Sequence, residues 1–161
     1  MKKFTLLLLV FLSVNCFAQS SATGTATVNA EIVSPISITS SGSLNFGKIA
    51  QDATAGDVII DATGTNRTFD NSNMEISAST FDVPTFTVTR ATGMKYGVIT
   101  SGDVLQTAGG DTMTLTNITT SLSTTSGLAD SSFTVGGTLQ VGANQAPGAY
   151  TGDVTVTVTY E

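Results

Sequence analysis

Apolar and polar residues alternate with a period of two along most of the chain, and no stretch shows the periodicity of an amphipathic helix. The clearest alternation near the N-terminus spans residues 22–32. Its apolar face consists of Ala22, Gly24, Ala26, Val28, Ala30 and Ile32, and Thr, Asn and Glu residues lie between them. At about 3.3 Å per residue this segment predicts a strand about 36 Å long.

Shorter segments with the same alternation follow, separated by clusters of turn-forming residues. They predict strands at 44–46, 58–61, 74–78, 85–90, 96–100, 113–118, 133–141 and 150–160. The short link 91–93 predicts a hairpin between two of them. The apolar face of the final segment includes Val154, Val156, Val158 and Tyr160. This spacing is typical of one all-β sandwich or barrel.

Residues 1–18 have the three parts of a secretory signal peptide. Lys2 and Lys3 are followed by the apolar run 4–14, and Ala18 precedes the expected cleavage site before Gln19. The apolar run is shorter than the about 20 residues of a membrane-spanning helix, so the mature chain, 19–161, is expected to be one exported domain without a membrane span. In a second interpretation Cys16 is acylated and retained as a lipoprotein anchor.

Charge and composition exclude several functions. After cleavage, four Lys and Arg remain against 12 Asp and Glu, a net charge of −8, which argues against nucleic acid and anionic membranes as partners. The chain has no His, and its only cysteine is Cys16, so His-based triads, Cys nucleophiles and zinc sites with nitrogen or sulfur ligands are excluded. The acids occur in turn-rich sequence, where residues 70–73 predict an Asx turn rather than a calcium loop. We expect no enzyme, cofactor or metal.

The segments 22–32 and 154–160 lack the Lys or Pro with which natural proteins blunt exposed sheet edges. Such strands should pair with something. Either they close the sandwich within one chain, or the N-terminal strand of one copy completes the sheet of the next copy.

Two parts of the chain are similar to a family of exported bacterial domains of unknown function, related to spore-coat-U-like and archaic chaperone–usher pilins. They are Leu44-Asn45-Phe46-Gly47 with the strand 56–60, and the run 142–160. The resemblance implies an immunoglobulin-like sandwich that lacks its last strand. A periplasmic chaperone fills the gap until a neighbour's N-terminal extension replaces it at an outer-membrane usher. The donor face would be Ala22 to Ile32, and the acceptor groove would be lined by Val154, Val156, Val158 and Tyr160.

The chain is therefore expected to be a structural subunit of a fimbrium, exported through the periplasm to the cell surface and associating with copies of itself. The alternative is a monomeric secreted or surface sandwich that binds a glycan or a protein through its loops. Many archaic pilins carry a cysteine near the strand that here reads Val58-Ile59-Ile60, and this chain has none. That difference also suits a surface protein that has the pilin fold and does not polymerise.

Overall fold

The computed structural model describes residues 20–161, so the expected signal peptide and Cys16 lie outside the described residues. The chain divides into two units, Met1–Ile32 and Val33–Glu161. Within the first unit, residues 20–32 form no strand and every one of them is exposed. All the strands of the described residues belong to the second unit.

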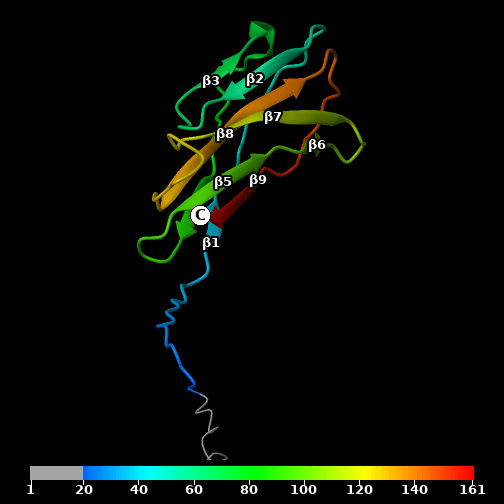
Figure 1. Ribbon diagram of the computed structural model, residues 1–161. Helices are drawn as coiled ribbons and strands as arrows, with labels where there is room; N and C mark the ends of the chain where they lie inside the picture. Colours follow the sequence, from blue (N-terminus) through cyan, green and yellow to red (C-terminus); the bar gives the residue numbers. More distant parts are fainter. Residues whose placement is uncertain (1–19) are drawn as a thin grey trace, which may run out of the picture. The chain divides into compact units, whose positions relative to one another are not determined.

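The second unit is built from nine antiparallel strands and one short 3-10 helix. The strands are β1 (Ser37–Ser41), β2 (Gly56–Ile60), β3 (Arg67–Phe69), β4 (Thr85–Thr89), β5 (Tyr96–Ser101), β6 (Val104–Gln106), β7 (Thr112–Thr120), β8 (Ser132–Val141) and β9 (Thr155–Tyr160). The larger sheet follows the order β1-β4-β8-β2-β3 (Figure 1). In addition, β7 pairs with β8, and β6 pairs with β7. β5 and β9 form the second sheet. No helix in residues 20–161 has the length and apolar character needed to cross a membrane.

Strand β8 organises the larger sheet because it changes partner along its length. Its first residues pair with β4, where Phe133 lies opposite Phe86, and its later residues pair with β2. β7 pairs along the opposite edge. Near the change of partner, a side chain at Gly136 would collide with the backbone of Ile60 and Asp61. A glycine is therefore required at this close approach of two strands.

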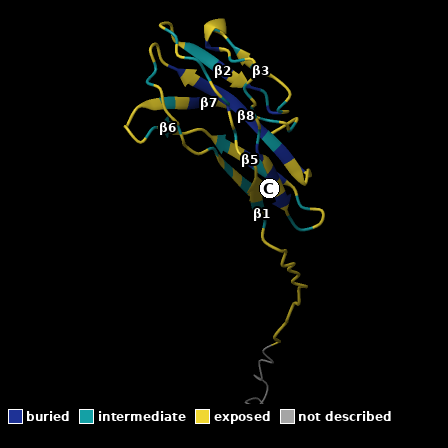
Figure 2. Ribbon diagram, turned by 180° about the vertical axis from the view of Figure 1, so that it is seen from behind, coloured by how far each residue is buried: buried dark blue, intermediate teal, exposed yellow. Residues whose placement is uncertain are grey.

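Two clusters of buried side chains form the core. In Figure 2 the ribbon of β8, which contributes residues to both clusters, is mostly dark blue. The first cluster comprises Phe46, Val58, Ile60, Met74, Leu115, Leu139 and Val141. The second comprises Phe86, Val88, Tyr96, Val98, Leu128, Phe133 and Val135. Because the second cluster joins β4 and β8 of one sheet to β5 of the other, the two sheets bury their apolar faces against each other. The predicted all-β sandwich is confirmed.

Five predicted strands are observed as β2, β4, β5, β7 and β8, with ends shifted by a few residues. The prediction for 74–78 is wrong, because Ser72–Met74 is a 3-10 helix capped by Asn71, whose side chain accepts a hydrogen bond from the Asn73 N–H at 3.1 Å. This capping turn matches the Asx turn expected at residues 70–73. The segment 44–46 contributes only a single bridge, between Asn45 and Asp82.

The predicted hairpin at 91–93 is also wrong. β4 pairs with β1 and β8, whereas β5 pairs with β9, so the connection crosses from one sheet to the other. The final predicted segment becomes a strand only at Thr155, and the residues before it contribute one bridge, between Gln106 and Thr151. Strands β1, β3 and β6 were not predicted.

Candidate strand-acceptor groove

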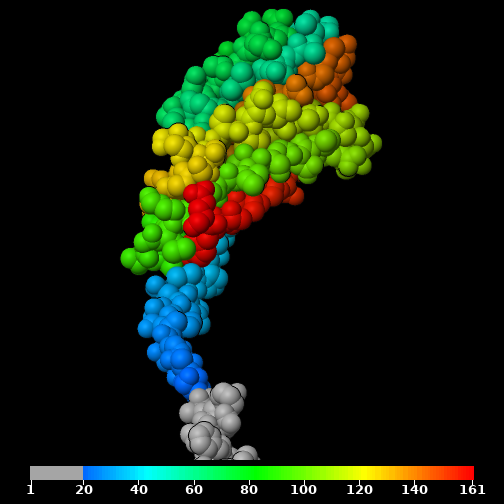
Figure 3. Space-filling view, in the orientation of Figure 1, coloured from blue at the N-terminus to red at the C-terminus, as the bar shows by residue number. Residues whose placement is uncertain are grey.

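Strand β9 has one paired edge and one open edge. Its residues pair with β5 from Tyr96 opposite Tyr160 to Ser101 opposite Thr155, and no strand of residues 20–161 pairs with its other edge. In Figure 3 the red atoms of β9 lie beside the green atoms of β5 at the margin of the domain. An open edge presents backbone N–H and C=O groups that another strand can pair with.

Strand β1 also has an open edge, since it pairs only with β4. β1 and β9 run in opposite directions, and apolar residues from both sides, Ile36 and Ile38 as well as Val156 and Val158, pack against the second core cluster. We call the space between the open edges of β1 and β9 the groove. At one end of the groove the Tyr160 hydroxyl donates a hydrogen bond to the Ser34 carbonyl at 2.9 Å. At the other end Ser40, just before the end of β1, and Val154, just before β9, line one cavity.

The four acceptor residues predicted from the sequence form one wall of this groove. Val154, Val156, Val158 and Tyr160 are each half-buried, and the threonines between them are exposed. On the neighbouring strand β5, the inward-facing Tyr96 is 0% exposed and Val98 is 6% exposed. The inward face of β9 thus lacks cover on its open side. Their role as an acceptor stays a prediction.

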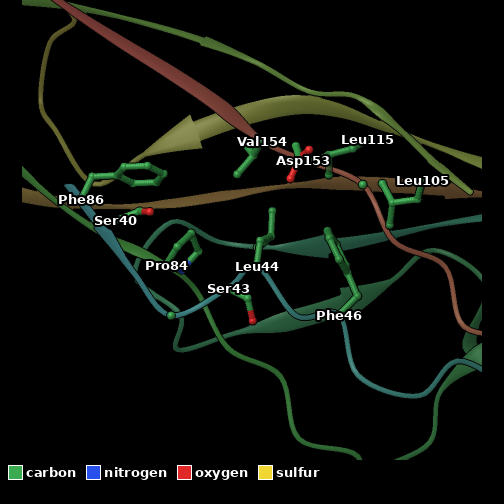
Figure 4. Close-up of a pocket in the computed structure, with 12 residues that line it drawn as sticks. Ser40, Ser43, Leu44, Phe46, Pro84, Phe86, Leu105, Leu115, Asp153 and Val154 are labelled. Carbon is green, nitrogen blue, oxygen red and sulfur yellow. The ribbon is translucent and has the colours of Figure 1, made fainter. Parts of the chain in front are cut away.

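The opposite wall and the floor come from segments that are far apart in sequence. Ile36 and Ile38 pack against the second core cluster from the side of β1. Next to Val154 the groove widens into a cavity of about 240 Å³ (Figure 4). Its apolar lining comprises Leu44, Phe46, Pro84, Phe86, Leu105, Leu115 and Val154. The sequence pattern did not show that these residues share a cavity.

A second cavity of about 510 Å³ continues the groove, since both cavities share Leu44, Phe46 and Leu105. Its lining adds Met113, Leu139, Val141 and the ring of Tyr150, with Lys48 and Gln51 among its polar residues. The groove therefore extends beyond the first residue of β9, Thr155, along the preceding residues 150–154.

The wall around Tyr150 is fixed by hydrogen bonds within the loop 142–150. The Gln145 side-chain amide donates to the Thr112 carbonyl at 3.1 Å and to the Tyr150 hydroxyl at 2.7 Å. The Tyr150 hydroxyl in turn donates to the Ala146 carbonyl at 2.7 Å. The Gln145 side-chain oxygen accepts from the Gly142 N–H at 3.1 Å. Because these polar groups satisfy one another, the cavity keeps an apolar floor with a defined rim.

The predicted donor segment contributes two large exposed apolar side chains. Val28 is 91% exposed and Ile32 is 98% exposed, and Ala22 to Ala30 are likewise exposed. Exposed apolar side chains on one face of an alternating segment, with Glu31 as its only charge, are a feature of interaction segments. The structure assigns residues 22–32 no strand partner within the described chain, so their pairing stays a prediction.

Two acidic residues, Asp52 and Asp61, accept hydrogen bonds within turns. The Asp61 carboxylate accepts hydrogen bonds from the Thr63 hydroxyl at 2.7 Å and the Thr65 N–H at 3.2 Å, and these bonds lower the pKa of Asp61. The pKa of Asp52 is lowered in the same way, chiefly by the Thr54 N–H and then by the Asn71 side chain. Carboxyl groups stabilised in their ionised form at exposed turns are poor general acids.

Each aromatic residue within residues 20–161 is buried or half-buried. Tyr96 is fully buried, and its hydroxyl donates to the Asp130 carbonyl at 2.9 Å. Burial, followed by the charge of Asp130, raises the pKa of Tyr96. These rings serve packing in this domain, as Phe86 and Phe133 do with centroids 5.7 Å apart.

No curated protein and no solved structure matches the sequence. A family model described as a domain of unknown function, DUF4402, matches residues 36–160. The match includes all nine strands and begins after the exposed residues 20–35. The chain therefore belongs to the DUF4402 family of domains of unknown function.

Proposed function

We propose that the protein is a structural subunit of a fimbrium-like surface fibre, assembled when residues 22–32 of one copy enter the groove of the next. One observation carries the proposal. The same chain contains an open groove between β1 and β9 and an exposed alternating segment of matching character. Each supplies what the other lacks: backbone partners on both edges and alternate apolar side chains facing the core.

Two interactions would stabilise the added strand. Each new backbone hydrogen bond contributes a net of about 0.5–1.5 kcal/mol. Burial of the exposed Val28 and Ile32 side chains adds about 1.5–3 kcal/mol each. Because donor and acceptor are different surfaces of one chain, the contact is head-to-tail and extends into a fibre unless the ring closes.

The proposal implies particular partners and a location. An open edge with half-buried apolar residues needs cover before assembly, and a periplasmic chaperone would supply it, with an outer-membrane usher organising the exchange, as in the pilins that the sequence resembles. The signal-like N-terminus supports export to the cell surface. The role is structural and requires no cofactor or catalytic step.

Ala26→Arg tests the proposal against the matched control Thr27→Arg. Both positions are exposed and adjacent, but only position 26 lies on the apolar face of the alternation. The mass of the mature chain, 19–161, is measured by size-exclusion chromatography with light scattering. We expect oligomers for the wild type and for Thr27→Arg, and monomers for Ala26→Arg. A wild-type chain that remains monomeric at all concentrations would favour a monomeric surface-binding domain instead.

A further inference from the structure

The alternating segment 22–32 is graded in size along its apolar face. Its first half carries Ala22, Gly24 and Ala26, and its second half carries Val28 and Ile32. A strand with such a gradient fits a groove in only one direction if the groove is graded as well.

The groove between β1 and β9 is graded. At the end marked by Tyr160 it is occupied by half-buried side chains from both walls, Ile36 and Ile38 on one side and Val156 and Val158 on the other. Both cavities lie toward the opposite end. The cavity of about 240 Å³ is beside Val154, and the cavity of about 510 Å³ is beside Tyr150.

We propose, on the basis of the function proposed above, that the segment from a second copy lies antiparallel to β9 and its preceding residues in one register. The opposing pairs are Ile32–Tyr150, Ala30–Gly152, Val28–Val154, Ala26–Val156, Gly24–Val158 and Ala22–Tyr160. Val28 then fills the smaller cavity and Ile32 the larger one. Both separations, from 28 to 32 and from 150 to 154, are four residues, or about 13 Å in an extended chain.

The smaller side chains of the segment match this register. Ala30 meets Gly152, where a side chain on the glycine would come within 3.1 Å of the Leu105 Cα and the Val104 carbonyl, so the backbone of 104–105 lies close at this position. Ala22, Gly24 and Ala26 fall at the end of the groove where Ile36 and Ile38 already pack from the side of β1, so this end takes small side chains. Glu31, the one charged residue of 20–32, falls at the end of the groove whose lining includes Lys48.

The register also determines which copy supplies the strand. β1 and β9 run in opposite directions, so a segment that turns back after Ser34 into its own groove would run antiparallel to β1 and parallel to β9. That direction puts Ile32 at the occupied end, next to Tyr160, and Ala22 at the larger cavity, next to Tyr150. Size matching therefore disfavours self-insertion and selects the neighbouring copy.

Cysteine cross-linking of chain 19–161, which has no native cysteine, tests this register. Gly24→Cys with Val158→Cys joins residues that oppose each other in the proposed direction. Ala30→Cys with Val158→Cys joins residues that oppose each other only in the reverse direction. Facing cross-strand residues have Cα separations of about 4.5–5.5 Å, within the range of a disulfide. A side chain at Gly24 meets no atom within 4 Å, and urea unfolding of Val158→Cys alone verifies that the domain folds.

After air oxidation, we expect a ladder of covalent oligomers on a non-reducing gel for the first pair and none for the second. A second pair, Ala26→Cys with Val156→Cys, repeats the test further along the groove. The register would be wrong if the Ala30 pair gave a ladder, or if oligomers formed that neither the Gly24 pair nor the Ala26 pair cross-linked. Either result would still be compatible with strand addition between copies. A fast-migrating monomer from the Ala30 pair would show self-insertion and overturn both proposals, as would wild-type protein that stays monomeric and uncross-linked.

Discussion

Val28→Ala should weaken assembly without destabilising the domain. Val28 is 91% exposed in the single chain, so its truncation removes almost no contact that the folded chain makes. In an added strand the same side chain would be buried in the cavity beside Val154. The substitution thus separates the energy of strand addition from that of folding.

The magnitude follows from the atoms removed. Val→Ala deletes the equivalent of about two methylene groups, each worth about 0.8 kcal/mol on burial, or about 1.6 kcal/mol in total. A difference of about 1.4 kcal/mol is tenfold in an equilibrium constant, so the association constant between copies should fall by about 15-fold. Any cavity left unfilled beside Val154 adds to this loss.

The assay is sedimentation equilibrium of the mature chain over a wide range of concentrations. The concentration at which half of the chains are assembled should rise by about 15-fold for Val28→Ala. The matched control is Thr27→Ala on the polar face, which should shift assembly by at most about 0.5 kcal/mol. Equal effects of both variants, or a lowered urea midpoint of monomeric Val28→Ala, would refute the reasoning.

Three further predictions concern the fold. Arg67→Met should lower the free energy of unfolding, measured in urea, by about 3 kcal/mol. The Arg67 guanidinium donates to the Phe46 and Ile76 carbonyls at 2.7 and 3.1 Å, and it lies over the rings of Phe69 and Phe81. A loss below about 1 kcal/mol would contradict this prediction. Gly136→Ala should prevent soluble expression, since its Cβ would collide with the Ile60 carbonyl, whereas Gly137→Ala meets only side-chain ends at 3.1–3.3 Å and a carbonyl at 3.4 Å and should fold. Burial raises the pKa of Tyr96 in the folded state. The stability that its neutral hydroxyl contributes is therefore fully present below the unfolded pKa of about 10 and is lost as pH rises through the folded pKa. Tyr96→Phe should reduce this alkaline fall of the urea midpoint, and an unchanged pH profile would contradict the assignment.

The alternation of apolar residues was sufficient to predict the strands that pack on both sides of the core. β4 has a clear period-two pattern because every second residue, such as Phe86, is buried. β8 alternates in sequence, although residues 135–139 are all buried in the structure. Met74 misled the prediction, since a buried residue of a 3-10 turn looks the same in sequence as a buried strand residue. β3 and β6 each have only three residues, too few to show a period.

Pairing was harder to predict than strand position. A short connection such as 91–93 permits either a hairpin or a crossing between sheets. Val88 and Val98 are buried in the same cluster, and their alternating patterns in sequence are compatible with either connection. The apolar face formed by Val154, Val156, Val158 and Tyr160 was evident from the sequence. The floor of the groove was not, because Leu44, Phe86, Leu105 and Leu115 come from four separate segments that meet only in the folded domain.

The measurement that tests the central claim most directly is the mass of the mature chain, 19–161, compared with that of a chain beginning at Pro35, both by size-exclusion chromatography with light scattering. If residues 22–32 complete the sandwich of a neighbouring copy, the longer chain runs as a ladder of oligomers and the shorter chain as a monomer. A longer chain that is a stable monomer, together with a shorter chain that unfolds or aggregates, would show that the segment completes its own sandwich and would contradict the account.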